Sequence, residues 1–403
     1  MPRSRIIAGV EIGTSKVAVL VGEVIDGRSL NIIALGQATS RGVRKGVIYD
    51  TAAAGHSVHA ALRSAEHNAG AAIESVYLAV TGGHLDGFEN SGVVTVEDAD
   101  NWVSPNDVQR AAQSARAKAL PDGRLYLTHV RGRAFLDGSE NPHPIKQQGS
   151  KLELRYWHIH ASRREVENLL WVINGYNDLN VQEVIPGSIA SGHIATTPEE
   201  RGLGALVVDI GAGTTDYALY RKGKVERTGV IPVGGDHLTN DLSMAFRISF
   251  KQAESLKLRY GTALLEPDKS RKVMLMGDYQ IGDRELPLHS ITRVINLRLG
   301  ETLAFIKNKL GSAISQQNTP AGVLLTGGTA QMPQIATLGR QIFGVETRVA
   351  DSPDWIRRED LRSPEFHSVI GLLRFGVQGG ALDDVAQPQT KSGFWPRIGQ
   401  FFK

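Results

Sequence analysis

The sequence contains no cysteine, which excludes thiol catalysis, thiolate metal sites and disulfide bonds. It has no apolar run that approaches the roughly 18 residues needed to span a bilayer as a helix. The first residues, MPRSRIIAGVEIG, have neither the long apolar core nor the small-residue cleavage site of a signal peptide, so we expect a cytoplasmic protein. Hydrophobic residues make up 41% of the chain and charged residues 22%, which is the composition of a globular protein.

The net charge is small, because 45 basic residues stand against 42 acidic ones. The basic excess lies in residues 391–403, which contain Lys391, Arg397 and Lys403 and no acid. We recognise no basic groove or aromatic-interleaved patch in the sequence, and we therefore do not expect nucleic acid as a partner.

Residues 206–220 (LVVDIGAGTTDYALY) have the pattern of a hairpin that binds phosphate. An apolar strand ends at Asp209, which is suited to hold a metal-bound water, and glycines in the turn allow positive φ and close backbone approach. An ordinary hairpin with glycine in its turn would have the same local pattern. The backbone N–H groups expected to converge on an anion are those of Gly211, Ala212, Gly213, Thr214 and Thr215.

Residues 7–21 (IAGVEIGTSKVAVLV) repeat this design near the N-terminus. Two similar hairpins suggest two related halves that hold one polyphosphate from opposite sides. The residues of this second hairpin that correspond to the acid, the turn and the start of the return strand are Glu11, Gly13, Thr14, Ser15 and Lys16.

A third element, residues 323–331 (VLLTGGTAQ), is an apolar strand that runs into Gly327 and Gly328. Without side chains at these two positions, a flat base could lie against the backbone. Taken in this order, the three elements resemble the phosphate-one, phosphate-two and adenosine motifs of the actin-type ATPase superfamily.

Periodicity predicts the other elements. Residues 184–196 (VIPGSIASGHIAT) form a small-residue helix after a Pro-Gly break, which fits either a hinge crossing or a tight helix pair. The patterns elsewhere predict strands at 30–38, 76–81, 92–97, 125–135 and 152–161, and helices at 50–68, 105–120, 164–176, 252–260, 292–312, 335–343 and 371–375.

Several polar side chains allow two interpretations. His158 and His160 share one face of a strand, and without a third ligand nearby in the sequence we interpret them as surface residues rather than a metal site. Glu254 and Lys257 lie one helical turn apart and could point at a common ligand or form an exposed ion pair. The helix at 292–312 has a basic face that is either solvated or able to receive an acidic or carboxyl-terminal peptide.

The C-terminal residues change composition abruptly. A Gly-, Pro- and polar-rich linker is followed by FWPRIGQFFK, whose large apolar residues fall on one face of a helix. Such a helix would bind a bilayer surface weakly and reversibly, or would dock on the protein itself or on a partner. The residues expected at the membrane are Phe394, Trp395, Arg397, Ile398, Phe401, Phe402 and Lys403.

Over essentially its whole length the chain resembles the FtsA family, the bacterial actin-like cell-division proteins that tether FtsZ to the membrane. The resemblance rests on VEIGTSKVAVLVGEV, SRGVRKG, VYLAVTGGH, VVDIGAGTTD, AESLKLRYG, VLLTGGTAQMP and the amphipathic tail. It implies an α/β protein with the actin-like two-lobe ATPase fold, built from duplicated ribonuclease-H-like domains with a small inserted α/β subdomain, 1C.

The family pattern implies a division of the chain into nine segments. The first lobe core (1A) takes 1–83, 163–198 and the return helix 364–376, with 1C at 84–162. The second lobe core (2A) takes 199–230 and 319–363, with subdomain 2B at 231–318. A flexible linker at 377–390 then leads to the membrane-targeting helix at 391–403.

The resemblance also implies ATP and Mg²⁺ as ligands, with Asp209 and Glu11 ordering the hydration shell of the magnesium. It implies an FtsZ C-terminal tail bound near the helix at 292–312, with Arg298 as the first candidate contact and Arg293 as the second. It also implies self-association into filaments, other divisome proteins bound by 1C, and anionic lipid at the cytoplasmic face of the division site. The implied nucleotide-binding residues are Gly13, Thr14, Ser15, Lys16, Gly211, Gly213, Thr214, Thr215, Gly234, Gly235, Glu254, Lys257, Gly327, Gly328 and Thr329.

One departure from hydrolysing relatives bears on activity. Pro186 and Gly187 stand where those relatives have an acid or amide that orients the attacking water, so we expect weak ATP hydrolysis at most, with nucleotide mainly closing the lobes. The alternatives are a pilus assembly protein of the PilM kind and, less favoured, a sugar-kinase-type phosphotransferase.

Overall fold

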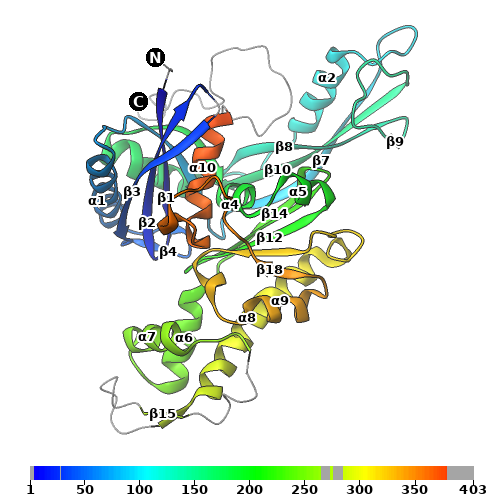
Figure 1. The fold of residues 1–403 in the computed structure, drawn as a ribbon. Coiled ribbons are helices and arrows are strands. Elements are labelled where there is room, and N and C mark those ends of the chain that lie inside the picture. Colours follow the sequence, from blue (N-terminus) through cyan, green and yellow to red (C-terminus); the bar gives the residue numbers. More distant parts are fainter. Residues whose placement is uncertain (1–3, 28, 265–272, 276–284, 379–403) are drawn as a thin grey trace.

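The computed structural model describes residues 4–27, 29–264, 273–275 and 285–378. Two five-stranded sheets form the centres of two lobes, and a smaller sheet extends from the first lobe (Figure 1). In the part of the chain that the structure describes, no helix is both long and apolar enough to cross a membrane. Of the linker predicted at 377–390, the first two residues belong to α10 (His367–Gln378). Residues 379–390 and the membrane helix predicted at 391–403 lie outside the described residues.

The first-lobe sheet has the strand order β11-β6-β1-β2-β3. β1 pairs antiparallel with β2 and parallel with β6, which in turn pairs parallel with β11. Buried residues in β1 and β2 make these two strands the centre of the first-lobe core. The strands span β1 Ser4–Ile12, β2 Lys16–Ile25, β3 Ser29–Thr39, β6 Ser75–Val80 and β11 Asn180–Pro186.

The second-lobe sheet repeats this topology in the order β14-β13-β12-β17-β18. β12 pairs antiparallel with β13 and parallel with β17, just as β1 pairs with β2 and β6. The two related halves predicted from the repeated hairpins are therefore present as two sheets of the same design. The strands span β12 Ala205–Ile210, β13 Thr215–Arg221, β14 Lys224–Ile231, β17 Val323–Thr326 and β18 Thr347–Val349.

A small α/β unit is inserted after β6. Its sheet has the order β7-β10-β8-β9, and α2 packs on one face over a separate buried core (Figure 1). β7 begins at Asp86 rather than at 92, so the strand predicted at 92–97 is longer and shifted. The elements span β7 Asp86–Thr95, α2 Pro105–Arg116, β8 Arg124–Leu136, β9 Ser139–Glu140 and β10 Lys151–Ser162.

Helices and short strands complete both lobes. α1 begins after Asp50, which caps the helix because its carboxylate accepts the Ala53 N–H at 3.0 Å. In the first lobe lie β4 Val43–Arg44, β5 Val47–Ile48, α1 Thr51–Ala69, α3 Arg163–Leu170, the π-helical turn η1 Trp171–Gly175 and α4 Gly187–Ala195. The second lobe contains α5 Pro198–Leu203, α6 Gly235–Phe246, α7 Phe250–Tyr260, β15 Val273–Leu275, β16 Glu285–Pro287, α8 Leu288–Leu310 and α9 Ile335–Phe343.

The small-residue helix α4 lies at the centre of the molecule beside α10 (Figure 1). A Cβ at Gly371 would lie 2.1 Å from the Ala190 carbonyl oxygen, so the two helices pack backbone against backbone. A Cβ at Gly192 would lie 2.2 Å from the hydroxyl of Tyr220, which places α4 against the second lobe as well. The tight helix pair is therefore present, and the hinge role of α4 stays a prediction.

The prediction that His158 and His160 are surface residues was wrong. His158 is fully buried and His160 is 7% exposed, because α2 covers this face of the sheet while Trp157, on the other face, donates to Thr228 of the second lobe. The Nδ1 atoms of His158 and His129 lie 2.6 Å apart, and burial lowers the pKa of each to about 4, so both imidazoles are neutral at pH 7.

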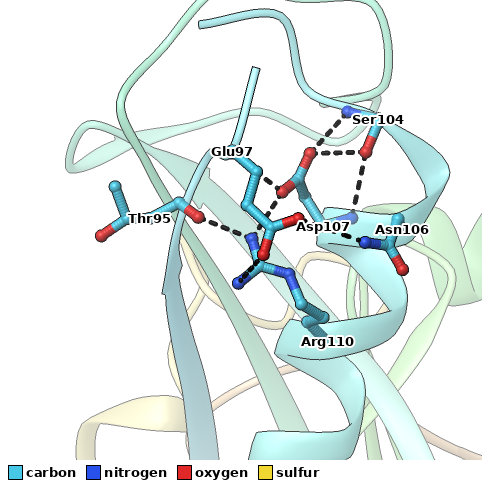
Figure 2. A network of polar contacts seen from close by, with 6 residues as sticks. All are labelled: Thr95, Glu97, Ser104, Asn106, Asp107 and Arg110. Atoms are coloured by element: carbon cyan, nitrogen blue, oxygen red, sulfur yellow. Dashed lines mark hydrogen bonds and ion pairs between the residues drawn. The ribbon is translucent and has the colours of Figure 1, made fainter. Parts of the chain in front are cut away.

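A buried carboxylate fixes the start of α2 against the end of β7 (Figure 2). Asp107 accepts the Ser104 hydroxyl at 2.6 Å and the Ser104 N–H at 2.9 Å, which completes a capping box. Arg110 contacts Asp107 at 2.7 Å and Glu97 at 3.1 Å, and it donates to the Thr95 carbonyl. Although burial raises the pKa of Asp107, its hydrogen bonds from Ser104 and Arg110 lower it from 3.8 to about 2.

The substitution Asp107→Asn tests this network. We expect it to lower the free energy of unfolding of the insert by about 1–3 kcal/mol, because Arg110 and the Ser104 N–H lose an ionised partner in a buried position. Since the pKa is lowered in the folded state, the stabilisation is present above pH 3.8 and is lost as the pH falls toward 2. Urea unfolding of both proteins across this range would measure it.

Asp122→Asn, on an exposed residue of the same insert, is the control and should leave stability unchanged. Equal unfolding midpoints for the wild type and the Asp107 variant at neutral pH would contradict the assignment.

Candidate nucleotide-binding site

A cavity of about 460 Å³ lies between the lobes and brings the three glycine-rich elements together. We call them the N-terminal hairpin (β1–β2), the central hairpin (β12–β13) and the Gly327 turn (327–329). Among the predicted nucleotide and metal residues, those lining the cavity are Glu11, Gly13, Thr14, Ser15, Lys16, Asp209, Gly211, Gly213, Thr214, Gly235, Glu254, Lys257, Gly327, Gly328 and Thr329.

Two predicted residues do not line the cavity and instead support its wall. Thr215 is fully buried and donates its hydroxyl to the Val233 carbonyl at 2.8 Å. A Cβ at Gly234 would lie 2.5 Å from the Gly211 carbonyl oxygen, so glycine there lets the start of α6 approach the central hairpin.

The two hairpin turns close in the same way. The Gly13 N–H donates to the Lys16 carbonyl at 3.0 Å, and the Gly211 N–H donates to the Thr214 carbonyl at 2.9 Å. The Gly211 N–H is therefore engaged within its own turn, unlike the convergent donor that the sequence predicts.

The turns from the two lobes touch each other. A Cβ at Gly213 would lie 2.2 Å from the Thr14 hydroxyl oxygen, so glycine is required where the lobes meet. Thr14 also accepts the Gly46 N–H at 3.2 Å, which holds the N-terminal hairpin against the segment before α1.

The Gly327 turn lies directly over the central hairpin. Gly327 has a φ of +87°, and a Cβ there would lie 2.3 Å from Asp209 Oδ1, so both conformation and space require glycine. Thr329 donates its hydroxyl to the Gly211 carbonyl at 3.0 Å. The adenosine-like and phosphate-like elements therefore form one continuous wall.

Three carboxylates face the cavity, of which Asp216 is buried and Glu11 and Asp209 are half-buried. Burial, aided by the nearby Asp209 carboxylate, raises the pKa of Glu11 from 4.5 to about 8 and that of Asp216 from 3.8 to about 7. Burial also raises the pKa of Asp209, to about 6. Glu11 Oε2 is buried and has no hydrogen-bond partner among the described residues. The cavity is therefore rich in carboxylates that a cation would stabilise in their ionised form.

The carboxylates do not form a ready-made metal cage. Within the described ranges, no group of three or more His, Asp and Glu side chains is arranged to hold a metal ion directly. A magnesium ion bound through its water shell is compatible with this arrangement, because Mg²⁺ usually keeps several waters.

Sequence reasoning missed the role of Asp216, although it lies within the motif VVDIGAGTTD. Thr81, at the end of β6 in the first lobe, donates its hydroxyl to Asp216 at 2.6 Å to Oδ1 and 2.7 Å to Oδ2. This contact crosses between the lobes. The one hint in the sequence was that β6 follows the N-terminal hairpin as β17 follows the central hairpin, so that the end of β6 has an equivalent place in the first lobe. Pro364 and Glu365, just before α10, and Ser368, within α10, also line the cavity and have no motif signal.

Lys257 and Glu254 form an ion pair of 2.7 Å at the cavity. Lys257 is 8% exposed and also donates to the Thr239 hydroxyl at 2.9 Å and the Gly235 carbonyl at 3.1 Å. The structure thus brings both predicted residues to the cavity, where Lys257 also ties α7 to the start of α6.

The two candidate arginines on α8 differ in their surroundings. Arg298 is half-buried and pairs with Asp241 of α6 at 2.7 Å and with Glu301 at 2.6 Å. Arg293 is exposed on the same helix. Leu297, on α8, and Met244, on the neighbouring helix α6, are each 64% exposed.

Comparison with known proteins agrees with these features. The family model described as cell division protein FtsA matches residues 206–371, and the model described as the SHS2 domain inserted in FtsA matches residues 82–160. The second range covers the inserted sheet and α2. The cell division protein FtsA of Pseudomonas aeruginosa is 31% identical over 380 residues, which cover 93% of this chain and 90% of that protein.

Solved structures share the fold. A chain of the PilM–PilN type IV pilus biogenesis complex superposes with a TM-score of 0.63 at 19% identity, covering 92% of this chain and 98% of that one. MreB5 of Spiroplasma citri bound to ADP superposes with a TM-score of 0.55 at 15% identity, covering 93% and 97%. The predicted actin-like α/β fold is confirmed, and the sequence match shows that this chain belongs to the FtsA family of cell division proteins.

Proposed function

We propose that this protein binds ATP between its lobes and tethers FtsZ filaments to the cytoplasmic membrane at the division site. The observation that carries the nucleotide part is the single cavity that unites the N-terminal hairpin, the central hairpin and the Gly327 turn. Its volume of about 460 Å³ lies in the usual range for small-ligand and cofactor sites. MreB5, a protein of similar fold whose structure was solved with ADP bound, supports the proposal of a nucleotide site.

Each part of the cavity suits one part of the nucleotide. The Lys16 ammonium would meet the phosphates as a point charge. The backbone N–H groups of the two hairpin turns would meet them as oriented dipoles, apart from those of Gly13 and Gly211, which are engaged within their own turns. Gly327 and Gly328 would let the adenosine lie against the backbone. Glu254 and Lys257 flank the ribose and base region.

The carboxylates suit a hydrated magnesium ion. Asp209 and Glu11 would accept hydrogen bonds from its water shell, and the buried Oε2 atom of Glu11 has no other partner among the described residues to satisfy it. Bound magnesium would neutralise charge on the phosphates. The protein itself would contribute by holding the Asp209 and Glu11 carboxylates close to Lys16.

We expect ATP turnover to be slow. Gly187 lines the cavity at the start of α4, where Pro186 precedes it, and neither residue has a polar side chain to orient a water. Nucleotide would then act mainly by closing the lobes and permitting self-association into filaments.

The FtsZ tail would bind along α8 and α6. Of the two candidates, Arg293 is better placed than Arg298, because Arg298 already pairs with Asp241 and Glu301. Arg293 together with exposed Leu297 and Met244 offers the charge and apolar contacts that an acidic or carboxyl-terminal peptide needs.

Membrane attachment rests on the sequence of residues 391–403, in which five large apolar residues would share one face of a helix, with basic residues opposite. The insert, as subdomain 1C, would contact other divisome proteins. The likeness to PilM supports the fold alone, and no feature of the cavity favours a sugar-kinase activity.

Replacing Lys16 with alanine should weaken MgATP binding by about 10- to 100-fold, because a charge-assisted contact to phosphate is worth about 1.5–3 kcal/mol. Isothermal titration calorimetry on the full chain would measure it. Lys151→Ala, at an exposed site of the insert, should bind like the wild type. Undiminished binding by the Lys16 variant would refute the phosphate assignment.

The stabilisation by MgATP should depend on pH. Because burial raises the pKa of Glu11 from 4.5 to about 8, the folded protein without ligand loses stability as the pH rises from 4.5 to about 8, where Glu11 ionises in the folded state. Magnesium favours the ionised carboxylates, so the rise in melting temperature caused by MgATP should be larger at about pH 9 than at about pH 7, on either side of this pKa. Scanning fluorimetry would show it, and Glu11→Gln should reduce the difference.

Recruitment of fluorescent FtsZ to liposomes with ATP and magnesium tests the tether. The full chain should bring FtsZ to anionic liposomes. A chain ending at Thr390 should not bind lipid and should not recruit FtsZ to the liposomes. Arg293→Ala should bind lipid normally and recruit less FtsZ. If the truncated chain recruits as well as the full one, the tail is not the membrane anchor.

A further inference from the structure

The phosphate-binding candidate Lys16 already has a protein partner. Its ammonium nitrogen lies 2.5 Å from Glu365 Oε2 and 3.9 Å above the centre of the Phe366 ring. The Lys16 and Glu365 side chains are 26% and 37% exposed, and both residues line the cavity. A carboxylate therefore holds Lys16 at the place where a phosphate oxygen would have to reach it.

Glu365 is held in place by its neighbours. It lies in the short 3₁₀ turn Pro364–Phe366 that leads directly into α10, and the Ser363 hydroxyl donates to its other oxygen at 3.4 Å. The Pro364 carbonyl accepts the Thr326 hydroxyl at 3.1 Å, which ties this turn to the end of β17. The carboxylate thus lies between the N-terminal hairpin and the Gly327 turn rather than on a long, unanchored loop.

The cavity has more carboxylates than cations. Glu11, Asp209 and Asp216 face it in addition to Glu365, while the basic side chains among its lining residues are those of Lys16 and Lys257. A triphosphate entering this cavity would meet the Glu365 charge next to its own, and like charges at short distance repel. The Lys16 ammonium, a compact charge with three donors, is the group for which phosphate and Glu365 compete.

We propose that Glu365 is an intramolecular competitor for the phosphates of the nucleotide. Its carboxylate occupies Lys16, and a bound phosphate takes Lys16 from it, so that the Glu365 side chain is released beside the first turn of α10. Glu365 is then a residue that sets nucleotide affinity, and the turn Pro364–Phe366 senses whether the cavity is filled. This inference rests on the proposed binding of ATP.

The test is a double-mutant cycle with MgATP as the probe, measured by calorimetry on the full chain. Glu365→Gln keeps the size of the side chain and removes the charge, and it should bind about 3- to 10-fold more tightly than the wild type. In the Lys16→Ala background, the same substitution should increase the affinity for MgATP by a clearly smaller factor. Thermal unfolding of each variant confirms that the fold is retained.

Glu359→Gln is the matched control. It makes the same change of charge in the segment before α10, on a side chain that is 88% exposed and pairs with Arg362, and it should leave affinity within about 2-fold of the wild type. The proposal would be overturned if Glu365→Gln binds MgATP as tightly as the wild type or more weakly. It would also be overturned if the substitution raises the affinity by the same factor with and without Lys16. If the wild type binds no ATP, the proposed function itself fails, and the inference fails with it.

Discussion

The contact between Gly213 and Thr14 is the constraint on which the site depends. With a Cβ position only 2.2 Å from the Thr14 hydroxyl oxygen, the central hairpin can meet the N-terminal hairpin only through a glycine. Any larger residue would push the two lobes apart. The Gly327 turn lies on Asp209 in the same way, since a Cβ at Gly327 would lie 2.3 Å from Asp209 Oδ1, so the wall of the cavity needs glycine at both contacts.

Close packing of this kind concentrates charge. Burying Glu11, Asp209 and Asp216 together is unfavourable for their ionised forms, and their raised pKa values express that cost. Lys16 offsets part of it, and Glu365 competes for the same ammonium group. Under the proposed function, a cation and a polyphosphate that bind together would each balance charge that the other brings into the cavity.

The insert is not an isolated appendage of the first lobe. Trp157 on β10 donates to Thr228 of β14 at 3.0 Å, and Lys222 in the β13–β14 turn pairs with Glu140 of β9 at 2.6 Å. Directly before the insert, Thr81 donates to Asp216 in the cavity. The inserted sheet is thus in contact with β14, which pairs with β13 of the central hairpin, and with the β13–β14 turn.

The sequence by itself determined the three glycine-rich elements, the repeated hairpin design and most helices, because close backbone approach demands glycine and periodicity follows local geometry. It could not show that His158 is buried, since the strand's alternation does not reveal that α2 and β14 cover both faces. Nor could it show the partners of Thr81 and Lys16. Asp216 and Glu365 lie far from them in the chain, and only the packing of the lobes around α4 and α10 decides which charges and hydroxyls meet.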